Sequence, residues 1–132
     1  MTTRHGGCTC GQLKVTVEGD PVRISVCHCL DCQRRTGSVF GTQARYPRKQ
    51  VRIEGTDTAF TRRADSGNTV TSHFCPVCGS TVYWELTVAP EVLAVAVGAF
   101  ADPDFPSPRF SVYERRRHGW ALPSKLAVEH LD

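Results

Sequence analysis

The sequence predicts a mostly β fold of many short strands, and three observations support this. Apolar and polar residues alternate with a period of two in several short runs, as in residues 13–17. Turn-forming residues separate these runs, for example at Gly19, Asp20 and Pro21. No alternation of strands with longer helical patterns is visible, so a parallel βαβ architecture is not expected.

The expected elements follow from this pattern in chain order. The strands are predicted over residues 13–17, 22–26, 39–46, 51–55, 58–63, 69–74, 81–86, 92–97 and 109–114. Residues 30–36 are expected to form one or two helical turns that end at Gly37. The run 92–97 is the most apolar, and because it is short and stops at Gly98 it predicts a central strand. Residues 102–108 contain three prolines and predict a loop.

Length and composition indicate one small domain. The chain has 132 residues, which suits a single domain over residues 1–132 with one hydrophobic core. No apolar run is long enough to span a membrane. The first six residues lack the apolar segment of a secretory signal, so a cytoplasmic location is expected.

The cysteines fall into three clusters whose spacing suits chelation. These are the C-x-C pair Cys8 and Cys10, the group Cys27, Cys29 and Cys32, and the C-x-x-C pair Cys75 and Cys78. Because their number is odd and a reducing compartment is expected, free thiols are predicted in place of disulfides. Two thiolates two or three positions apart on a tight turn can reach one ion, and zinc prefers four ligands in a tetrahedron.

A count of ligands divides the seven cysteines between two zinc ions. The C-x-C and C-x-x-C pairs together supply four thiolates, which would close a structural site. The middle group supplies three, and three protein ligands with a fourth position open are typical of a catalytic zinc. Three alternatives stay open: His5, His28 or His73 could close the middle site, the C-x-x-C pair could be a redox disulfide, and the C-x-C pair could group with the middle cysteines.

The cysteines also change how the net charge is interpreted. The formal charge of +3 counts every cysteine as neutral. Seven thiolates and two divalent ions together would bring it to zero, so the net charge gives no support for a nucleic-acid partner.

These motifs resemble the glutathione-dependent formaldehyde-activating enzyme / centromere protein V family. The similar segments are residues 7–11, 27–37 and 74–80, within a resemblance that extends from about Gly6 to Trp120. The resemblance implies a β-tent fold of short antiparallel strands stapled by two zinc ions. It implies that Cys8, Cys10, Cys75 and Cys78 hold the structural ion and that Cys27, Cys29 and Cys32 hold the catalytic one.

The resemblance also implies an activity. The enzyme that gives the family its name joins glutathione to formaldehyde and forms S-hydroxymethylglutathione, so a zinc-dependent carbon–sulfur lyase type of reaction is expected. A thiol held by the zinc would be deprotonated and oriented for attack on the aldehyde, or the ion could polarise the carbonyl. One position departs from the family: relatives often have Pro-x-x-His near the C-terminus, and here Pro108 is followed by Ser111 in place of the histidine.

Glutathione carries two carboxylates, which arginine binds best. Arg34 and Arg35 directly follow the middle cysteines and are predicted to bind them, the alternative being a solvated helix face. Residues 115–117 form a second basic run, which is more typical of a solvated loop. His73 and Tyr83 are expected to pack and not to react, and Trp84 and Trp120 are expected to be core or lid residues.

Three functions are consistent with the sequence. The first is a zinc lyase acting on a thiol–aldehyde adduct, with glutathione or another small thiol as the partner. The second is a non-catalytic zinc module that binds a protein or nucleic acid, and the absence of a basic tail argues against it. The third is a carrier that binds glutathione without accelerating a reaction.

Overall fold

The computed structural model describes residues 1–121 and 128–131, and within these ranges the strands form two sheets. The smaller sheet has the order β1-β2-β5, with β1 (Thr3–Gly7), β2 (Lys14–Glu18) and β5 (Val51–Glu54). The larger sheet has the order β11-β10-β3-β4-β9-β8-β7-β6. Its strands are β3 (Arg23–Cys27), β4 (Gly41–Pro47), β6 (Thr58–Arg63), β7 (Thr69–Phe74), β8 (Thr81–Leu86), β9 (Val92–Ala96), β10 (Phe110–Val112) and β11 (Glu129–His130).

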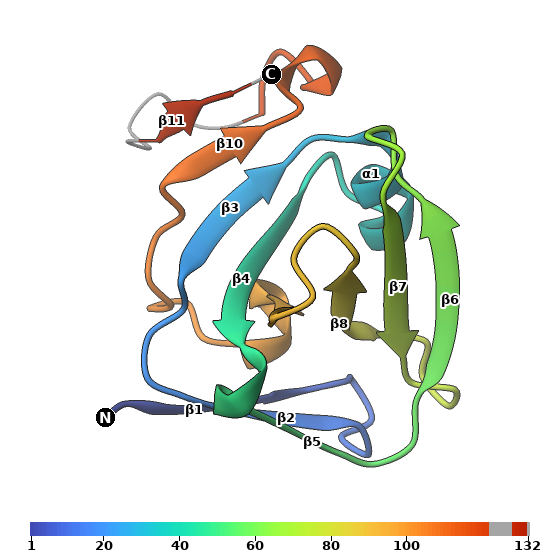
Figure 1. Ribbon diagram of the computed structural model, residues 1–132, viewed down its shortest axis with the longest axis vertical. Helices are drawn as coiled ribbons and strands as arrows, with labels where there is room; N and C mark the ends of the chain where they lie inside the picture. The colour runs from blue at the N-terminus through green and yellow to red at the C-terminus, as the bar shows by residue number, and fades with distance from the viewer. Residues whose placement is uncertain (122–127, 132) are drawn as a thin grey trace.

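The larger sheet is curved. In Figure 1 the small sheet lies across the bottom, β3 and β4 stand on the left, and β7 and β6 stand on the right. β8 lies in the middle of the view, between β4 and β7. The helices are short: α1 (Leu30–Thr36), η1 (Arg48–Gln50), η2 (Val97–Phe100) and η3 (Glu114–Arg116). No helix in the described ranges has the length and apolar character needed to cross a bilayer. The mostly β class predicted from the sequence is confirmed.

The alternation of side chains on β3 and β4 gives the larger sheet two different faces. Ile24 lies opposite Ala44 in the register, and both belong to the main hydrophobic core together with Tyr46. Arg23 lies opposite Arg45, one position away on each strand. Successive residues of a strand point to opposite faces, so this arginine pair lies on the other side of the sheet from the core.

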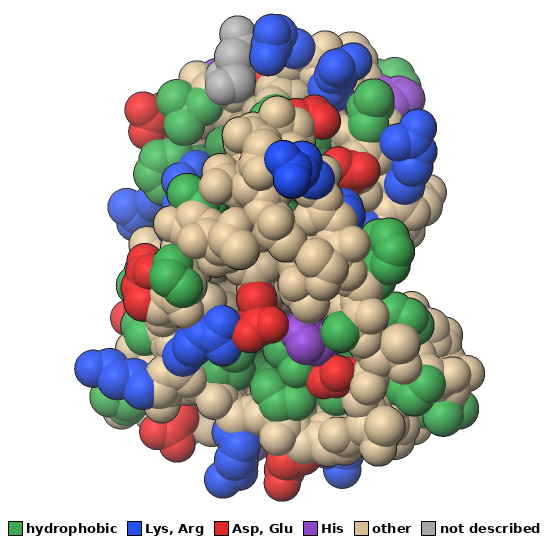
Figure 2. Space-filling view, turned by 45° about the vertical axis from the view of Figure 1, so that its right-hand side comes forward, with side chains coloured by type: hydrophobic (Ala, Val, Ile, Leu, Met, Phe, Trp, Pro, Cys, Tyr) green, Lys and Arg blue, Asp and Glu red, His purple; other side chains and the backbone are tan. Residues whose placement is uncertain are grey.

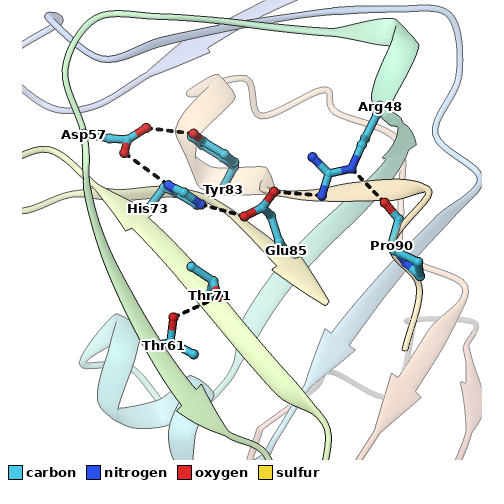
Figure 3. A network of polar contacts seen from close by, with 8 residues as sticks. All are labelled: Arg48, Asp57, Thr61, Thr71, His73, Tyr83, Glu85 and Pro90. Atoms are coloured by element: carbon cyan, nitrogen blue, oxygen red, sulfur yellow. Dashed lines mark hydrogen bonds and ion pairs between the residues drawn. The ribbon is translucent and has the colours of Figure 1, made fainter. Parts of the chain in front are cut away.

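A chain of polar contacts ties β7 and β8 to the segment between β5 and β6 (Figure 3). Asp57 accepts a hydrogen bond from the Tyr83 hydroxyl at 2.7 Å and contacts Nδ1 of His73 at 3.1 Å. Nε2 of His73 lies 3.0 Å from Glu85, whose other oxygen pairs with Arg48 at 2.7 Å. The rings of His73 and Tyr83 stack with centroids 4.4 Å apart, so these two residues pack as expected.

This network reaches the surface. The side chains of Arg48 and Glu85 are 45% and 36% exposed. On the face of the molecule drawn in Figure 2, basic and acidic side chains are interspersed and do not gather into one basic patch. The hydrogen bond from Arg48 lowers the pKa of Glu85, which favours the charged form of this carboxylate.

Most of the expected elements are found. Helix α1 and strands β6, β7 and β8 have the predicted bounds, and β9 is a central strand between β4 and β8. Gly37 ends α1 in the left-handed conformation with φ of 71° and donates to the carbonyl of Gln33 at 2.8 Å. This is the glycine cap predicted from the sequence.

The two ends of the chain differ from the expectation. Strand β1 was not predicted, because its Gly6 and Gly7 give no alternating pattern. The expected strand 109–114 is shorter, since Tyr113 turns to a left-handed φ of 56° after β10. β10 pairs in parallel with both β3 and β11, so the expectation of antiparallel strands is wrong at this edge.

The central strand is also one residue shorter than expected, because Val97 belongs to η2 and not to β9.

We expect a Gly55→Ala variant to be less stable than a Gly67→Ala variant. Both glycines have positive φ, 101° and 90°, but a Cβ at Gly55 would lie 2.0 Å from the carbonyl oxygen of Gln12, whereas a Cβ at Gly67 would meet nothing within 4 Å. Strained backbone alone costs about 1 kcal/mol, and the clash should add roughly 2 kcal/mol or more. Urea unfolding measures the difference, and equal losses would contradict this reading of the segment between β5 and β6.

Candidate metal centres

The structure brings four cysteines from two distant loops together. They are Cys8, Cys10, Cys75 and Cys78, and their Sγ atoms all lie within 4.8 Å of one another. The Sγ atom of Cys10 is 3.6 Å from those of both Cys8 and Cys75. A disulfide requires about 2.05 Å, and all seven cysteines are free thiols, so no disulfide joins the C-x-x-C pair in this structure.

The spacing of these sulfur atoms fits a tetrahedral zinc ion. Bonds of about 2.3 Å in a tetrahedron place the sulfur atoms about 3.8 Å apart. The observed 3.6 Å is close to that value. An all-sulfur set of four ligands is typical of a closed structural zinc site. We call this group the four-cysteine centre.

Backbone and side-chain donors surround the sulfur atoms of the four-cysteine centre. The N–H of Leu13 donates to Cys8 at 3.3 Å, and the N–H of Val77 donates to Cys75 at 3.4 Å. Gln12 donates through Nε2 to Cys75 at 3.0 Å. Such donors orient the ligands and favour the thiolate form that binds metal.

Two hydroxyl groups join the loops independently of sulfur. Thr9 Oγ1 and Ser80 Oγ lie 2.9 Å apart, and the N–H of Thr9 donates to the same Ser80 oxygen at 3.2 Å. The hydrogen bond with Ser80 is also the main reason why the pKa of Cys78 falls to about 5. The loops are therefore held close together by groups other than the ligands.

The middle cysteines form a second centre at the junction of β3 and α1. Cys27 ends β3, Cys29 is the N-cap of α1, and Cys32 lies in its first turn. The N–H of Cys32 donates to Sγ of Cys29 at 3.3 Å, and all three residues are buried, with exposed fractions of 6 to 8%. Hydrogen bonds from Cys27 and Cys32 lower the pKa of Cys29, and the contact with Cys29 raises the pKa of Cys27. Three close sulfur atoms with a ready thiolate suit a soft or borderline metal ion such as zinc.

No histidine joins this three-cysteine centre among the residues that the structure describes. His28 is fully buried, and its Nε2 lies 3.0 Å from Oγ of Ser111. His5 contacts Thr16, and His73 belongs to the network of Figure 3. The sulfur atoms of Cys8 and Cys10 belong to the other centre, so neither a closing histidine nor that regrouping of cysteines is found.

Ser111 occupies the position where the family pattern has a histidine, and its contact with His28 shows its role in this chain. Ser111 is completely buried on β10, which runs parallel to β3 and places Ser111 opposite Val26. Its hydroxyl is therefore directed to His28 and not to the three sulfur atoms. In this chain the position supports the strand that carries Cys27.

A cavity of about 200 Å³ opens beside the three-cysteine centre. Its apolar wall is formed by Val70, Trp84, Leu86, Val88 and Val112. Its polar lining includes Arg23, Arg45, Arg62, Asp31, Asp65, Gln43, Ser66 and Asn68. The cavity thus combines the three sulfur atoms with an apolar wall and several cationic side chains.

Tyr113 is a residue of this site that the sequence did not single out. It packs against the three cysteines with Val112 and lines the cavity. Its left-handed backbone is rare for an aromatic residue, and such conformations concentrate at functional sites. Nothing in the local sequence signals this conformation.

The predicted arginines lie outside the described lining of the cavity. Arg34 is exposed on the last turn of α1. The guanidinium of Arg35 stacks on the ring of Trp84 at 4.1 Å and lines a separate groove that also includes Cys78. Trp84 itself is buried, with an exposed fraction of 5%, whereas Trp120 is 75% exposed. Trp84 is therefore a core residue, one of the two expected places, whereas Trp120 does not belong to the core.

Comparison with known proteins agrees with this geometry. The family model of the glutathione-dependent formaldehyde-activating enzyme matches residues 3–116. A crystal structure of a Rhodobacter sphaeroides protein, solved as a structural genomics target, superposes with a TM-score of 0.57 and 22% identity. The match covers 77% of this chain and 90% of that one, and at this identity it supports the fold alone. No protein with a curated description matches the sequence.

The fold and the two cysteine centres define a small β protein able to bind metal at two places. The matched segment covers most of the chain, which therefore belongs to the glutathione-dependent formaldehyde-activating enzyme family.

We expect the two centres to respond differently to loss of a ligand. Wild-type protein should contain two zinc ions per chain, and Cys29→Ala should contain one and stay folded. Cys78→Ala should lose cooperative unfolding, because a structural zinc contributes on the order of 10 kcal/mol while a domain is stable by only about 5–15 kcal/mol. Elemental analysis and thermal unfolding measure both effects. Identical behaviour of the two variants would show that the division into structural and substrate-binding centres is wrong.

Proposed function

We propose that this chain is a zinc-dependent carbon–sulfur lyase-type enzyme acting on the adduct of an aldehyde with glutathione or another small thiol, such as S-hydroxymethylglutathione. The observation that supports this most strongly is the three-cysteine centre on the wall of a cavity. Membership of the family supports glutathione and formaldehyde as the reacting partners.

The reaction adds the S–H of the thiol across the C=O of the aldehyde. A sulfur–carbon bond forms, the π bond of the carbonyl breaks, and the thiol proton ends on the former carbonyl oxygen; the lyase direction reverses these changes. Zinc at the three-cysteine centre would lower the pKa of a bound thiol and act as a Lewis acid.

The surrounding residues have separate roles in this proposal. Cys27, Cys29 and Cys32 hold the ion, and Val112 and Tyr113 exclude water from one side of it. The charge of Arg62 also favours the thiolate of Cys29, and Arg62 is itself held by Asp31 at 3.0 Å. The apolar wall lowers the local dielectric, which strengthens these interactions.

The binding of glutathione carboxylates by Arg34 and Arg35 stays a prediction. Their place on α1, directly after Cys32, supports it. A reducing compartment such as the cytoplasm suits both the seven free cysteines and a thiol substrate.

The test is the rate at which glutathione and formaldehyde interconvert with their adduct, followed by NMR exchange spectroscopy. Zinc-loaded wild-type protein should raise this rate at least about tenfold above the spontaneous reaction, and Cys29→Ala should abolish the increase. Val77→Ala, at a position that is 76% exposed beside the other centre, is the control and should keep full activity.

Two results would contradict the proposal. Glutathione binding without any acceleration would indicate the carrier function. Equal activity of Cys29→Ala and wild type would separate the reaction from the three-cysteine centre.

A further inference from the structure

We propose that Arg23 and Arg45 form a carboxylate-binding subsite in the cavity beside the three-cysteine centre, and that the thiol substrate is therefore one that carries a carboxylate about 10 Å from its sulfur. The inference rests on the proposed function, because it names the part of the thiol that the cavity recognises. It assigns recognition to two residues far from Arg34 and Arg35 in the sequence.

The first argument is that the two arginines face each other. Arg23 of β3 and Arg45 of β4 are direct partners in an antiparallel register. Directly opposed residues have Cβ atoms about 5 Å apart, and like charges in such a pair destabilise a sheet. Both residues line the cavity, so their charges converge on the same space.

The second argument is that neither arginine has an acidic partner among the described residues. Their Nε atoms are buried, and their N–H groups donate to no hydrogen-bond partner within those ranges. Arg23 stacks on the ring of Phe110 at 4.4 Å. By contrast, Arg62 in the same cavity is already paired with Asp31 at 3.0 Å.

Burial and the neighbouring charges act together on Arg45. Loss of solvent lowers the pKa of its guanidinium, and the positive charge of Arg23 lowers it further. Cys27 and Glu91 act in the opposite direction through their charges, but neither forms an ion pair with it in the described part of the chain. An anion bound between the two arginines would offset this repulsion.

The third argument is distance. Arg23 and Cys27 lie four residues apart on β3 and therefore on the same face, with Cα atoms about 13 Å apart. In glutathione the eight bonds from the sulfur to the γ-glutamyl carboxylate span about 10 Å when extended, and the long arginine side chains can cover the difference. A thiol held near Cys27 could thus place a carboxylate between Arg23 and Arg45.

The floor of the cavity between these two points is fixed by buried hydrogen bonds. The indole N–H of Trp84 donates to Gln43 at 3.1 Å, and Gln43 donates to Ser25 at 3.1 Å. Ser25 and Gln43 are the register pair between the arginines and Cys27. The subsite and the three-cysteine centre are therefore held at a constant separation.

The chemistry of the pair favours a carboxylate. Guanidinium groups bind carboxylates in a bidentate manner, and such charge-assisted bonds are stronger where water is excluded. A thiol without a carboxylate would leave both cations unpaired, which gives discrimination against it. Glutathione meets this requirement.

The experiment compares glutathione with its diethyl ester, in which both carboxylates are neutral, by calorimetric titration of the zinc-loaded full chain. Wild-type protein should bind glutathione at least about tenfold more tightly than the ester. Arg45→Gln and Arg23→Gln should each remove most of this preference. Each should weaken the binding of glutathione and leave the binding of the ester unchanged. Arg45→Lys should keep part of it, since the charge stays but the bidentate contact is lost.

Arg52→Gln is the matched control, because Arg52 is exposed on β5 of the small sheet and should keep the full preference. Removing one charge from the Arg23–Arg45 pair relieves repulsion, so we expect both variants to fold with an unchanged or higher melting temperature. Should Arg45→Gln fail to fold, Arg23→Gln provides the same comparison.

The outcomes separate this inference from the proposed function. If both arginine variants keep the wild-type preference, the inference is overturned, while adduct formation can still support the proposed function. If the preference disappears in the variants but no adduct formation is accelerated, the subsite stands and the proposed function fails. If wild-type protein binds neither compound, both are wrong.

Discussion

The fold depends on a contact between two loops that each carry two cysteines. The loop after β1 and the loop between β7 and β8 meet through Cys10 and Cys75, which are 65 positions apart and have their sulfur atoms 3.6 Å from each other. Four thiolates so close together would repel one another unless a cation lies among them. A metal ion bound at this point would fix the small sheet against the larger one. Gln12 extends the junction by hydrogen bonding to both Cys75 and the backbone of Thr56.

Strand β3 contributes residues both to the hydrophobic core and to the cavity beside the three-cysteine centre. On β3, alternate residues face opposite sides: Ile24 enters the core, whereas Arg23 and Cys27 face the cavity. The same strand is supported from its edge by β10 through the contact of Ser111 with His28. Packing in the core therefore sets the register that positions both the cation pair and one of the three sulfur atoms.

The sequence predicts local features of this protein better than long-range ones. Period-two alternation found most strands, and Gly37 marked the end of α1 because its cap chemistry is local. The spacing of the cysteines indicated two sets, and the structure brings together those same sets. The pairing of Arg23 with Arg45 could not be predicted, because it depends on the register of β3 with β4. The left-handed Tyr113 depends in the same way on tertiary packing.

The central claim is that an external thiol completes the coordination of an ion held by Cys27, Cys29 and Cys32. The most direct measurement is the absorption spectrum of protein with cobalt at this centre, recorded during titration with glutathione. Binding of a fourth thiolate should intensify the sulfur-to-cobalt charge-transfer band in a saturable manner, and the Cys29→Ala variant should show no such change. A spectrum of the wild-type protein that is unaffected by glutathione and by other small thiols would contradict the claim.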